Sequence, residues 1–494
     1  MNSRLLSWCL LSATALGCVV DIGGPPKGAG IRVVRDISRA DTIDAEPNAR
    51  MVIEITDSNG RLNHDVVVNV AGLPSPADPE QLGMLAMDTL RAQVGSIALT
   101  TSRQTSFLVK FGRRAGPAGI LITVPELELA DSVSFTVMPG DPAFIRLKPG
   151  DTAVMVGNSF TQDAIIIDRG GNDLGLHATF SSSSPAVTVA PTGKVDGSAV
   201  GRAGIMVRYV APSGLLQETA MVSVVPPGEI AQAISAPGAT VTSAIGVRRT
   251  DGTMIRSYPT PQAPFEPMWS PDGAKVYYVG TDQQSNSQRL YSLNIADGAI
   301  QTIVPDTVAA LSGRSLAWPA PSRDGVWIYF TAQEPGNFSS VWRIHPDGTG
   351  AEKLVGDAPP PGDYRFRNCP SPSPDGTRLA YTEKSVAAND VDVIDLTSRV
   401  VTVISGTGAD EVRWSPTGTR LATRGGAGLY VVNPDGSGLR QIAGPISYFG
   451  GLDWSPDGAF VVVKMDSKPT IVDPDKGLFL PVPLDGSGLA WGPK

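Results

Sequence analysis

From residue 31 onward, apolar and polar residues alternate over short runs that are separated by clusters of Gly, Pro, Asp and Asn. A period of two places alternate side chains on opposite faces of a strand, and such clusters are typical of tight turns. One weak apolar stripe at helical spacing occurs near residues 81–94. Because strand-like runs dominate, the pattern predicts an all-β fold.

Two series of strand-like runs precede residue 227, and Pro139-Gly140-Asp141-Pro142 lies between them. Strands with one apolar face each bury that face against a second sheet, so each series predicts a β-sandwich module, over residues 31–141 and 142–226. The runs of the first series are 49–56, 66–70, 106–111, 119–124 and 132–138, and those of the second are 152–156, 163–167, 178–181, 187–189, 204–210 and 218–225.

The strongest signal is a repeated turn. Trp269-Ser-Pro-Asp-Gly273 recurs around Asp375, Thr417 and Asp457, and in a degenerate form, with two extra residues, from Trp318 to Gly325. The turn positions 272, 324, 375, 417 and 457 lie 52, 51, 42 and 40 residues apart. An apolar strand and a second hairpin follow each turn, and four strands in this length are typical of one propeller blade.

Both ends of this region hold an incomplete unit. Residues 488–493, with Trp491, have the pattern of a first strand, and residues 239–257, around Thr250-Asp251-Gly252, have the pattern of a hairpin that lacks its first strand. Joining the two completes a sixth blade and removes the exposed sheet edges of an open array. We therefore predict a six-bladed β-propeller over residues 240–494, preceded by a linker at 227–239.

The repeats resemble those of the TolB-type propeller family over the whole of residues 240–494. Residues 142–226 resemble bacterial Ig-like domains, on Asp168-Arg-Gly-Gly-Asn172 and the Ser-rich run that ends in Pro185-Ala-Val187. Residues 31–141 share only the opening turn and the closing linker with such domains. These resemblances imply a periplasmic, protein-binding propeller with Ig-like modules as spacers.

The first residues have the pattern of an export signal. Arg4 precedes a twelve-residue apolar run at 5–16, which is too short for a stable membrane span and typical of a signal peptide. The run ends in Ala15-Leu16-Gly17-Cys18, which resembles the lipobox of bacterial lipoproteins and implies removal of residues 1–17 and lipidation of Cys18. Residues 18–30 have the composition of a tether. An ordinary secretory signal with an incidental cysteine is the alternative.

Composition excludes several classes of function. The net charge is −8 with scattered Lys and Arg, so no basic stripe for nucleic acid is present. Cys9, Cys18 and Cys369 are too few for a disulfide framework or a Cys-rich zinc site, and the three histidines are far apart in the sequence. Motifs of nucleotide-binding loops, serine hydrolases and zinc proteases are absent. We expect no cofactor, no metal and no catalytic residue.

Charged residues just before the repeated tryptophan are the candidates for partner binding, because the first strand of each blade lines the channel. With two aromatic residues at the rim they are Glu266, Arg314, Arg365, Arg367, Glu411, Arg413, Tyr448, Phe449 and Asp453. The alternative is that these charges pair with one another across a solvated channel.

The favoured function is that of an exported lipoprotein, anchored in the cell envelope on the periplasmic side of the outer membrane or at the cell surface. It would bind a protein or peptide there and touch the membrane only through its lipid. A hydrolase or lyase acting on an envelope polysaccharide or peptide is the alternative. Paired carboxylates at one end of the channel would favour the enzyme, whereas a mixed-charge, aromatic-rich face would favour binding.

The lipid anchor is directly testable. Replacing Cys18 by Ser removes the thiol that would receive the lipid, so the protein should move from the membrane fraction to the soluble fraction after cell lysis. Cys9→Ser is the matched control and should leave partitioning unchanged. A Cys18→Ser protein that stays with membranes would contradict lipidation at this residue.

Overall fold

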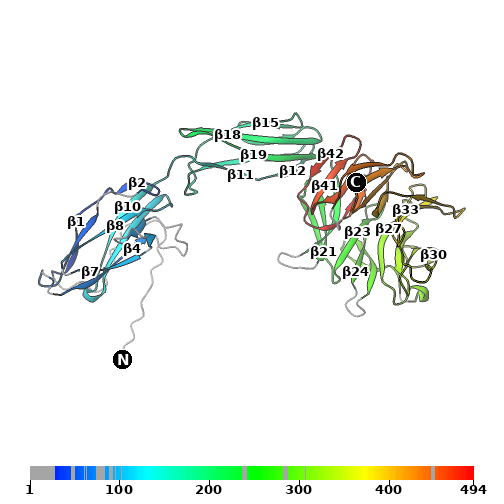
Figure 1. Ribbon diagram of the computed structural model, residues 1–494, viewed down its shortest axis with the longest axis horizontal. Coiled ribbons are helices and arrows are strands. Elements are labelled where there is room, and N and C mark those ends of the chain that lie inside the picture. Colours follow the sequence, from blue (N-terminus) through cyan, green and yellow to red (C-terminus); the bar gives the residue numbers. More distant parts are fainter. Residues whose placement is uncertain are drawn as a thin grey trace, which may run out of the picture. The chain divides into compact units, whose positions relative to one another are not determined.

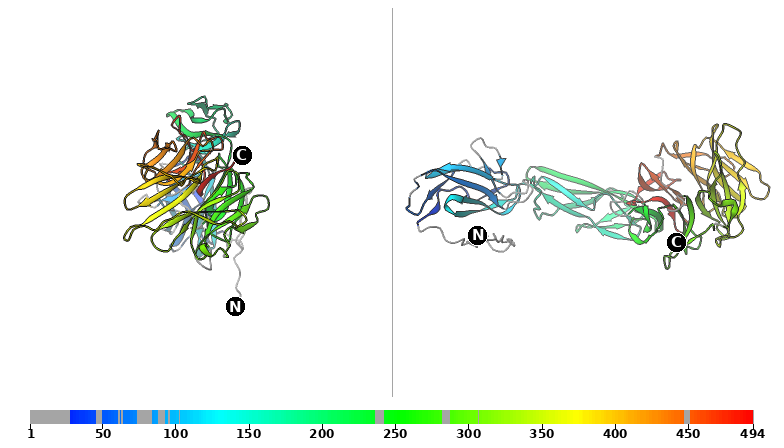
Figure 2. Two further views of the ribbon diagram at one scale, coloured as in Figure 1. Left: turned by 90° about the vertical axis from the view of Figure 1, so that its right-hand side faces the viewer. Right: turned by 90° about the horizontal axis from the view of Figure 1, so that it is seen from below.

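The computed structural model describes residues 28–45, 50–60, 62, 64–73, 84–87, 93–94, 96–101, 103–235, 242–281, 287–305, 307–446 and 451–493. Strands dominate these residues, with the short 3₁₀ helices η2 (Pro125–Leu127) and η3 (Ala309–Leu311) between them (Figures 1 and 2). The predicted signal peptide and Cys18 lie outside the described residues. Within these residues, no helix has the length and apolarity needed to cross a membrane.

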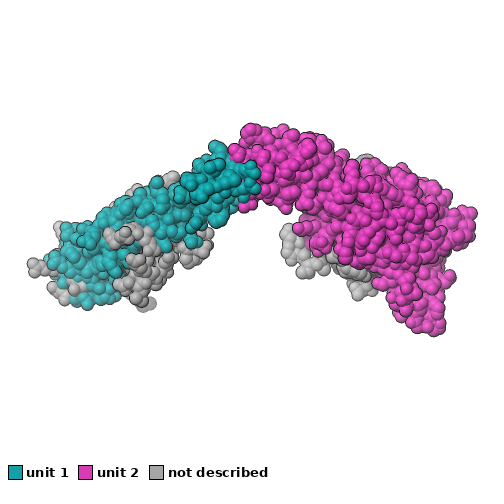
Figure 3. Space-filling view, turned by 45° about the horizontal axis from the view of Figure 1, so that its top comes forward, with its two compact units in different colours: residues 1–146, 164–178, 208–217 teal, residues 147–163, 179–207, 218–494 magenta. Residues whose placement is uncertain are grey.

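The chain divides into two compact units, coloured teal and magenta in Figure 3. The first comprises residues 1–146, 164–178 and 208–217, and the second comprises residues 147–163, 179–207 and 218–494. The residues of the second predicted module, 142–226, are divided between the two units.

The first unit contains a sandwich of two five-stranded sheets. One sheet has the order β1 (Gly30–Arg35), β3 (Met51–Thr56), β8 (Gln104–Phe111), β5 (Met84–Met87), β6 (Gln93–Val94), and the other β2 (Ala40–Thr42), β10 (Leu129–Met138), β9 (Gly116–Val124), β4 (Val66–Leu73), β7 (Ser96–Thr101). Ile53 and Phe107 of the first sheet share one core with Ile120 and Phe135 of the second. The weak helical stripe near residues 81–94 contains the strands β5 and β6.

Residues 144–225 form three further sheets: β11 (Phe144–Lys148) with β14 (Asp163–Ile167); β12 (Thr152–Met155), β19 (Gly214–Val225), β18 (Gly201–Ala211) and β15 (Thr179–Ser182); and β13 (Ser159–Thr161), β17 (Lys194–Gly197) and β16 (Val187–Val189). All six runs predicted in this series are strands. The strands β11, β13 and β17, which have five residues or fewer, were not predicted.

The Asp168-Arg-Gly-Gly-Asn172 loop explains why the predicted boundary near residue 141 does not separate compact units. Asp168 is fully buried and accepts hydrogen bonds from the backbone N–H groups of Gly140, Gly170 and Asn172. Burial opposes ionisation, but these bonds and the Asn172 amide outweigh it and hold the pKa of Asp168 below its usual value. The loop is thereby fastened to the segment that the sequence marks as a linker.

The described residues from 229 onward form six four-stranded antiparallel sheets, named here blades 1 to 6. Blades 1 to 3 are β23 (Pro264–Trp269), β24 (Lys275–Thr281), β25 (Gln288–Asn294), β26 (Ile300–Thr302); β27 (Leu316–Pro321), β28 (Ile328–Gln333), β29 (Ser339–Ile344), β30 (Glu352–Val355); and β31 (Arg365–Pro372), β32 (Arg378–Ser385), β33 (Asn389–Asp395), β34 (Val401–Ile404). Blades 4 to 6 are β35 (Ala409–Trp414), β36 (Leu421–Gly425), β37 (Gly428–Val432), β38 (Arg440–Ala443); β39 (Leu452–Trp454), β40 (Val461–Met465), β41 (Lys468–Asp473), β42 (Leu478–Pro481); and β43 (Ser487–Trp491), β20 (Glu229–Ser235), β21 (Thr242–Arg249), β22 (Met254–Pro259).

The first strands contact one another in a closed cycle, β43, β23, β27, β31, β35, β39 and back to β43. This is the arrangement of a β-propeller. The last strand, β43, pairs with β20 (Ile230 with Trp491), so the predicted closing role of residues 489–491 is confirmed.

The predicted linker at residues 227–239 is wrong, because it contains β20. Ile230, Ala231 and Ala233 of this strand are fully buried. The small alanines pack in the same apolar cluster as Trp269 of blade 1. Alanine has little strand preference, which is why the run does not stand out in the sequence.

The repeated Ser-Pro-Asp-Gly residues form tight turns held by side-chain hydrogen bonds. In blade 1 the Ser270 hydroxyl donates to Asp272 (2.6 Å) and accepts from the backbone N–H of Lys275, while Gly273 has a φ of 70° that favours glycine. Serine hydroxyls make equivalent bonds in blades 2, 3 and 5, to Asp324, Asp375 and Asp457. The tryptophans pack between blades: Arg378 and Arg420 stack on Trp414 and Trp454 of the following blade, 4.8 and 5.2 Å from the ring centres.

The interpretation of Trp318 as the repeated tryptophan of blade 2 is wrong. Trp269 pairs with Val276 in blade 1, whereas Pro321 pairs with Ile328 in blade 2. Pro321 therefore holds the register position of the repeated tryptophan, and no extra residues are present. Trp318 falls three positions earlier, level with Glu266.

Removing residues 488–494 should open the cycle. The deletion removes the pairing of β43 with β20 and the buried Trp491, so we expect the propeller to lose at least about 3 kcal/mol of unfolding free energy, measured by urea denaturation. Trp327→Ala, which removes a half-buried indole from blade 2, is the control and should cost less. Unfolding of the truncated protein at the wild-type urea concentration would contradict closure through β43.

Candidate functional site

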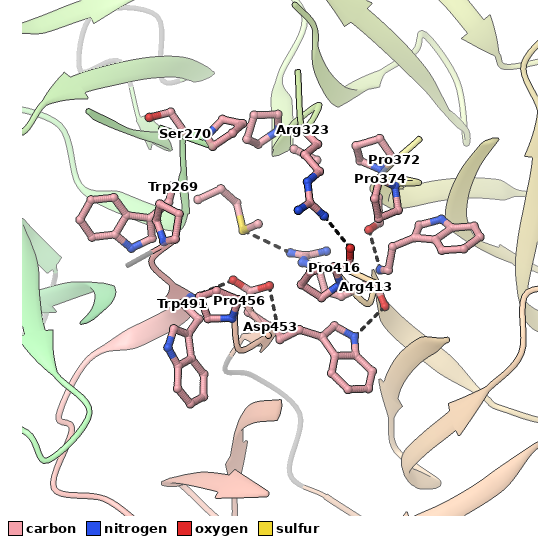
Figure 4. Close-up of a pocket in the computed structure, with 18 of the residues that line it drawn as sticks. Trp269, Ser270, Arg323, Pro372, Pro374, Arg413, Pro416, Asp453, Pro456 and Trp491 are labelled. Carbon is pink, nitrogen blue, oxygen red and sulfur yellow. Dashed lines mark hydrogen bonds between the residues drawn. The ribbon is translucent and has the colours of Figure 1, made fainter. Parts of the chain in front are cut away.

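One end of the channel opens at the Ser-Pro-Asp-Gly turns, in a hollow of about 380 Å³ that we call the proline-tryptophan mouth (Figure 4). Its rim contains prolines of the repeated turns and the tryptophans that precede them. Its lining is Met268, Trp269, Ser270, Pro271, Ala320, Pro321, Arg323, Ser371, Pro372, Pro374, Arg413, Trp414, Pro416, Asp453, Trp454, Pro456, Trp491, Gly492 and Pro493.

Blade 2 departs from the repeat at this rim. Arg323 stands where the other repeated turns have a proline, such as Pro416 in blade 4. The exposed guanidinium of Arg323 donates to the backbone carbonyl of Pro416 (2.6 Å), and so reaches from blade 2 to blade 4 (Figure 4). Rigid rings and one exposed cation therefore shape the rim.

Below the rim lies a buried cation. Arg413 on β35 donates to the Cys369 thiol (2.6 Å) and to the carbonyl of Val412 (2.9 Å), and its Nη2 lies 3.8 Å from the Met268 sulfur. Burial favours the neutral guanidinium, but Cys369, Glu411 and Asp453 outweigh burial and raise the pKa of Arg413 above its usual range. Arg413 is therefore a permanent positive charge inside the channel.

Side chains of the first strands also hold neighbouring blades together. Three such side chains accept a hydrogen bond from a backbone N–H of the next blade. Glu266 accepts from Trp318 (2.7 Å), Ser371 accepts from Trp414 (2.9 Å), and Asp453 accepts from Trp491 (2.8 Å). Each bond joins one blade to the next one along the chain. The bond of Asp453 reaches the closing strand, so this carboxylate has a structural role.

Burial inside the channel disfavours charge on these acids. It raises the pKa of Glu266 to about 8, and the nearby carboxylate of Glu411 acts in the same direction. It raises the pKa of Asp453 to about 6 against the attraction of Arg413, and that of the Cys369 thiol to about 11. Cys369 is thus a buried neutral thiol that contacts a guanidinium.

Three first strands share a bulge that the sequence analysis missed. Glu266, Trp318 and Cys369 have φ values of 51°, 58° and 55°, each precedes a proline, and the strand register shifts beside each one. Bulges re-aim side chains. The signal was present as a proline at the same repeat position in three blades.

The predicted binding residues fall into two groups. Glu266, Glu411, Arg413 and Asp453 lie close enough to influence one another electrostatically in the channel. By contrast, three arginines make ion pairs within single blades: Arg314 with Glu334 in blade 2, and Arg365 and Arg367 with Glu383 (3.5 and 2.7 Å) in blade 3. Tyr448 and Phe449 lie outside the described residues.

Glu411 is also paired, with Arg424 at 3.0 Å, and both side chains are buried, as is Arg367. Reversing the charge of Glu411 or Arg367 would replace a buried salt bridge by two like charges. Loss of one partner of a buried salt bridge typically costs about 3–5 kcal/mol of unfolding free energy. If these charges served partner binding alone, reversing Glu411 or Arg367 would leave the melting temperature nearly unchanged; because both are in buried ion pairs, we expect reversal to lower it. Arg323 and Met268 at the mouth are functional candidates that the sequence analysis missed.

Histidine and metal chemistry have little place in the described residues. His345 sits at a turn, with Nδ1 2.9 Å from the carbonyl oxygen of Val326 and its ring stacked on Trp327. Among the described side chains, no three His, Cys, Asp or Glu residues are grouped so that they could hold a metal ion.

No family model matches the sequence. A TolB homologue from Chlorobium luteolum is 26% identical over 160 residues, which are 31% of this chain and 33% of that protein. The chain thus matches about a third of the length of this curated relative. Among solved structures, TolB from Acinetobacter baumannii aligns with a TM-score of 0.44 and 18% identity over 65% of this chain and 84% of that one. An oligogalacturonate lyase in complex with manganese aligns with a TM-score of 0.35 and 13% identity over 67% of this chain and 99% of that one.

Glu266 should make stability depend on pH. Its pKa rises from 4.5 in the unfolded chain to about 8 on folding, so the folded protein holds the proton more tightly and loses stability as the pH rises through this window. Glu266→Gln removes the titration and keeps an acceptor for the N–H of Trp318. The variant should match the wild type near pH 5 and melt at a higher temperature near pH 9. The exposed Glu218→Gln is the control, and a Glu266→Gln difference that does not grow with pH would contradict the assignment.

Proposed function

We propose that the chain is an exported, lipid-anchored protein of the cell envelope that binds another protein through the proline-tryptophan mouth. In this proposal the lipid is on Cys18, residues 31–226 are two Ig-like spacer modules, and the six blades are a TolB-type propeller. The similarity to a TolB homologue supports the propeller type. A location in the cell envelope, on the periplasmic side of the outer membrane or at the cell surface, follows from the proposed anchor.

The composition of the mouth carries the proposal. Prolines and packed tryptophans form a preorganised rim, which lowers the entropy lost on binding. The rim tryptophans are themselves buried between the blades, whereas Arg323 is exposed, and arginine is among the residue types that most often dominate protein interfaces. Arg323 is exposed and bound to a single carbonyl oxygen, that of Pro416, so a partner carboxylate could take its place. The charged residues Arg323, Arg413 and Asp453 among the rigid rings of the lining support binding at this mouth.

Catalysis is the less supported alternative. The buried carboxylates Glu266 and Glu411 are committed to the N–H of Trp318 and to Arg424. Glu266 is not among the residues that line the mouth. A general acid or base must reach its substrate, and these groups serve the packing between strands instead.

Site-specific photo-crosslinking tests the proposal. A photoreactive amino acid in place of Arg323, introduced into the full chain in cells, should yield a covalent adduct with one envelope protein. Arg256 is the matched control, because it is also exposed and donates to a single backbone carbonyl, that of Ile295 (3.0 Å), on the outer strand of blade 6. The same substitution there should give no such adduct.

With the partner identified, Arg323→Glu should weaken its binding by about tenfold or more, chiefly by slowing association and reducing the salt dependence. Arg256→Glu should leave both unchanged, and the two variants should melt alike. An adduct that forms from the loops at residues 281–289 or 332–340, or from the sandwich modules, but not from position 323, would place the binding surface elsewhere.

A further inference from the structure

A second hollow, of about 130 Å³, lies in the same propeller. Its lining is Trp318, Asn368, Thr382, Lys384, Asn389, Ala409, Asp410, Glu411 and Arg424. Lys384 lies near the end of β32 and Asn389 at the start of β33, whereas the Ser-Pro-Asp-Gly turn of the same blade precedes β32. The hollow therefore opens at the opposite end of the blades from the proline-tryptophan mouth.

The side chains between the two hollows are packed. Along β35, Glu411 borders the second hollow and Arg413 borders the mouth, and both are buried. Arg413 is held by Cys369 and Glu411 by Arg424. The two hollows are thus separate sites and not the ends of one open pore.

Trp318 is built into the second hollow at a cost. A bulky residue at a φ of 58° is a backbone outlier, and such a conformation is strained. The bond from its N–H to Glu266 fixes this backbone. Blades 5 and 6 have Gly451 and Gly488, with φ values of 82° and 62°, at the matching position, where they carry no such strain. A large aromatic residue therefore occupies a position at which glycine would carry no backbone strain.

The polar groups around Trp318 offer both donors and acceptors without net charge. Lys384 and Arg424 are two cations, and Asp410 and Glu411 are two carboxylates. Asn389 donates weakly to Asp410 (3.5 Å), and its buried Oδ1 has no hydrogen-bond partner among the described residues. Asn368 and Thr382 add an amide and a hydroxyl. A neutral ligand that donates and accepts many hydrogen bonds fits this lining better than an anion or a cation.

We propose that this hollow binds a neutral sugar unit of an envelope glycan. A pyranose ring has an apolar C–H face that packs on an indole, and its hydroxyl groups both donate to carboxylates and accept from amides and cations. The site is independent of the partner protein proposed for the mouth.

Trisaccharides test the site on the full chain. The neutral probes are cellotriose, maltotriose and the trimer of N-acetylglucosamine, with trigalacturonate as an anionic counterpart and a capped, uncharged tetrapeptide as a protein-like one. Saturation-transfer NMR detects contact, and calorimetric titration gives the affinity. At least one neutral trisaccharide should bind with a dissociation constant of about 1 mM or lower, more tightly than trigalacturonate and the tetrapeptide.

Variants locate the binding. Trp318→Leu and Asn389→Ala should each weaken it about tenfold or more, and Asn389 covers the case in which Trp318→Leu fails to fold. Trp327→Leu, a half-buried indole elsewhere in blade 2, and Arg323→Ala at the mouth should leave it unchanged.

Three results would overturn the proposal. They are no saturation transfer to any neutral trisaccharide at about 10 mM, wild-type affinity in both Trp318→Leu and Asn389→Ala, or preference for trigalacturonate or the tetrapeptide. Because Arg323→Ala acts only at the mouth, loss of partner binding and loss of sugar binding are separable outcomes.

Discussion

The cycle of first strands around the channel is the constraint on which the propeller depends. Neighbouring sheets pack face to face through apolar clusters, such as the one that joins Val279 of blade 1 to Leu316 and Phe330 of blade 2. At the axis, where no common apolar core exists, each inner strand is fastened to the next by polar side chains. The bonds from Glu266 to the N–H of Trp318, from Ser371 to that of Trp414 and from Asp453 to that of Trp491 do this, and the last one secures the strand that returns from the C-terminus. Tryptophans with arginines stacked on them fill the space between successive blades.

This fastening explains what the channel charges do. Charged side chains near an axis invite interpretation as a binding lining, yet a buried charge must be paired or neutralised. Glu411 is paired with Arg424, and Arg413 with a thiol and a carbonyl oxygen, while burial keeps Glu266 largely protonated. The interior of the channel is therefore an ionic core, and ligands can be recognised only at its two ends.

The two ends differ in chemistry because the blades depart from their own repeat at different places. At the turn end, blade 2 has Arg323 where the repeat has proline, which adds one cation to a rigid, apolar rim. At the other end, the bulge before Pro319 places Trp318 among amides and balanced charges. Each proposed ligand follows from one departure, a carboxylate-bearing protein at the first and a neutral sugar at the second.

The sequence by itself determined the all-β class, most strand positions, the repeated turns and the closing strand, because alternation and turn residues are local properties. The spacing of the repeats was enough to predict that residues 489–491 belong to the same blade as the hairpin around residue 250. Only the tertiary structure decided the register within a blade, which moved Trp318 out of the tryptophan position, and revealed β20 in a supposed linker. It also decided which charges meet: Arg314 finds its partner within blade 2, and Arg365 and Arg367 find theirs within blade 3. Pairing and burial depend on neighbours as far apart in the chain as Arg367 and Glu383, at 16 residues, or Ile230 and Trp491, at 261 residues, and no local pattern records them.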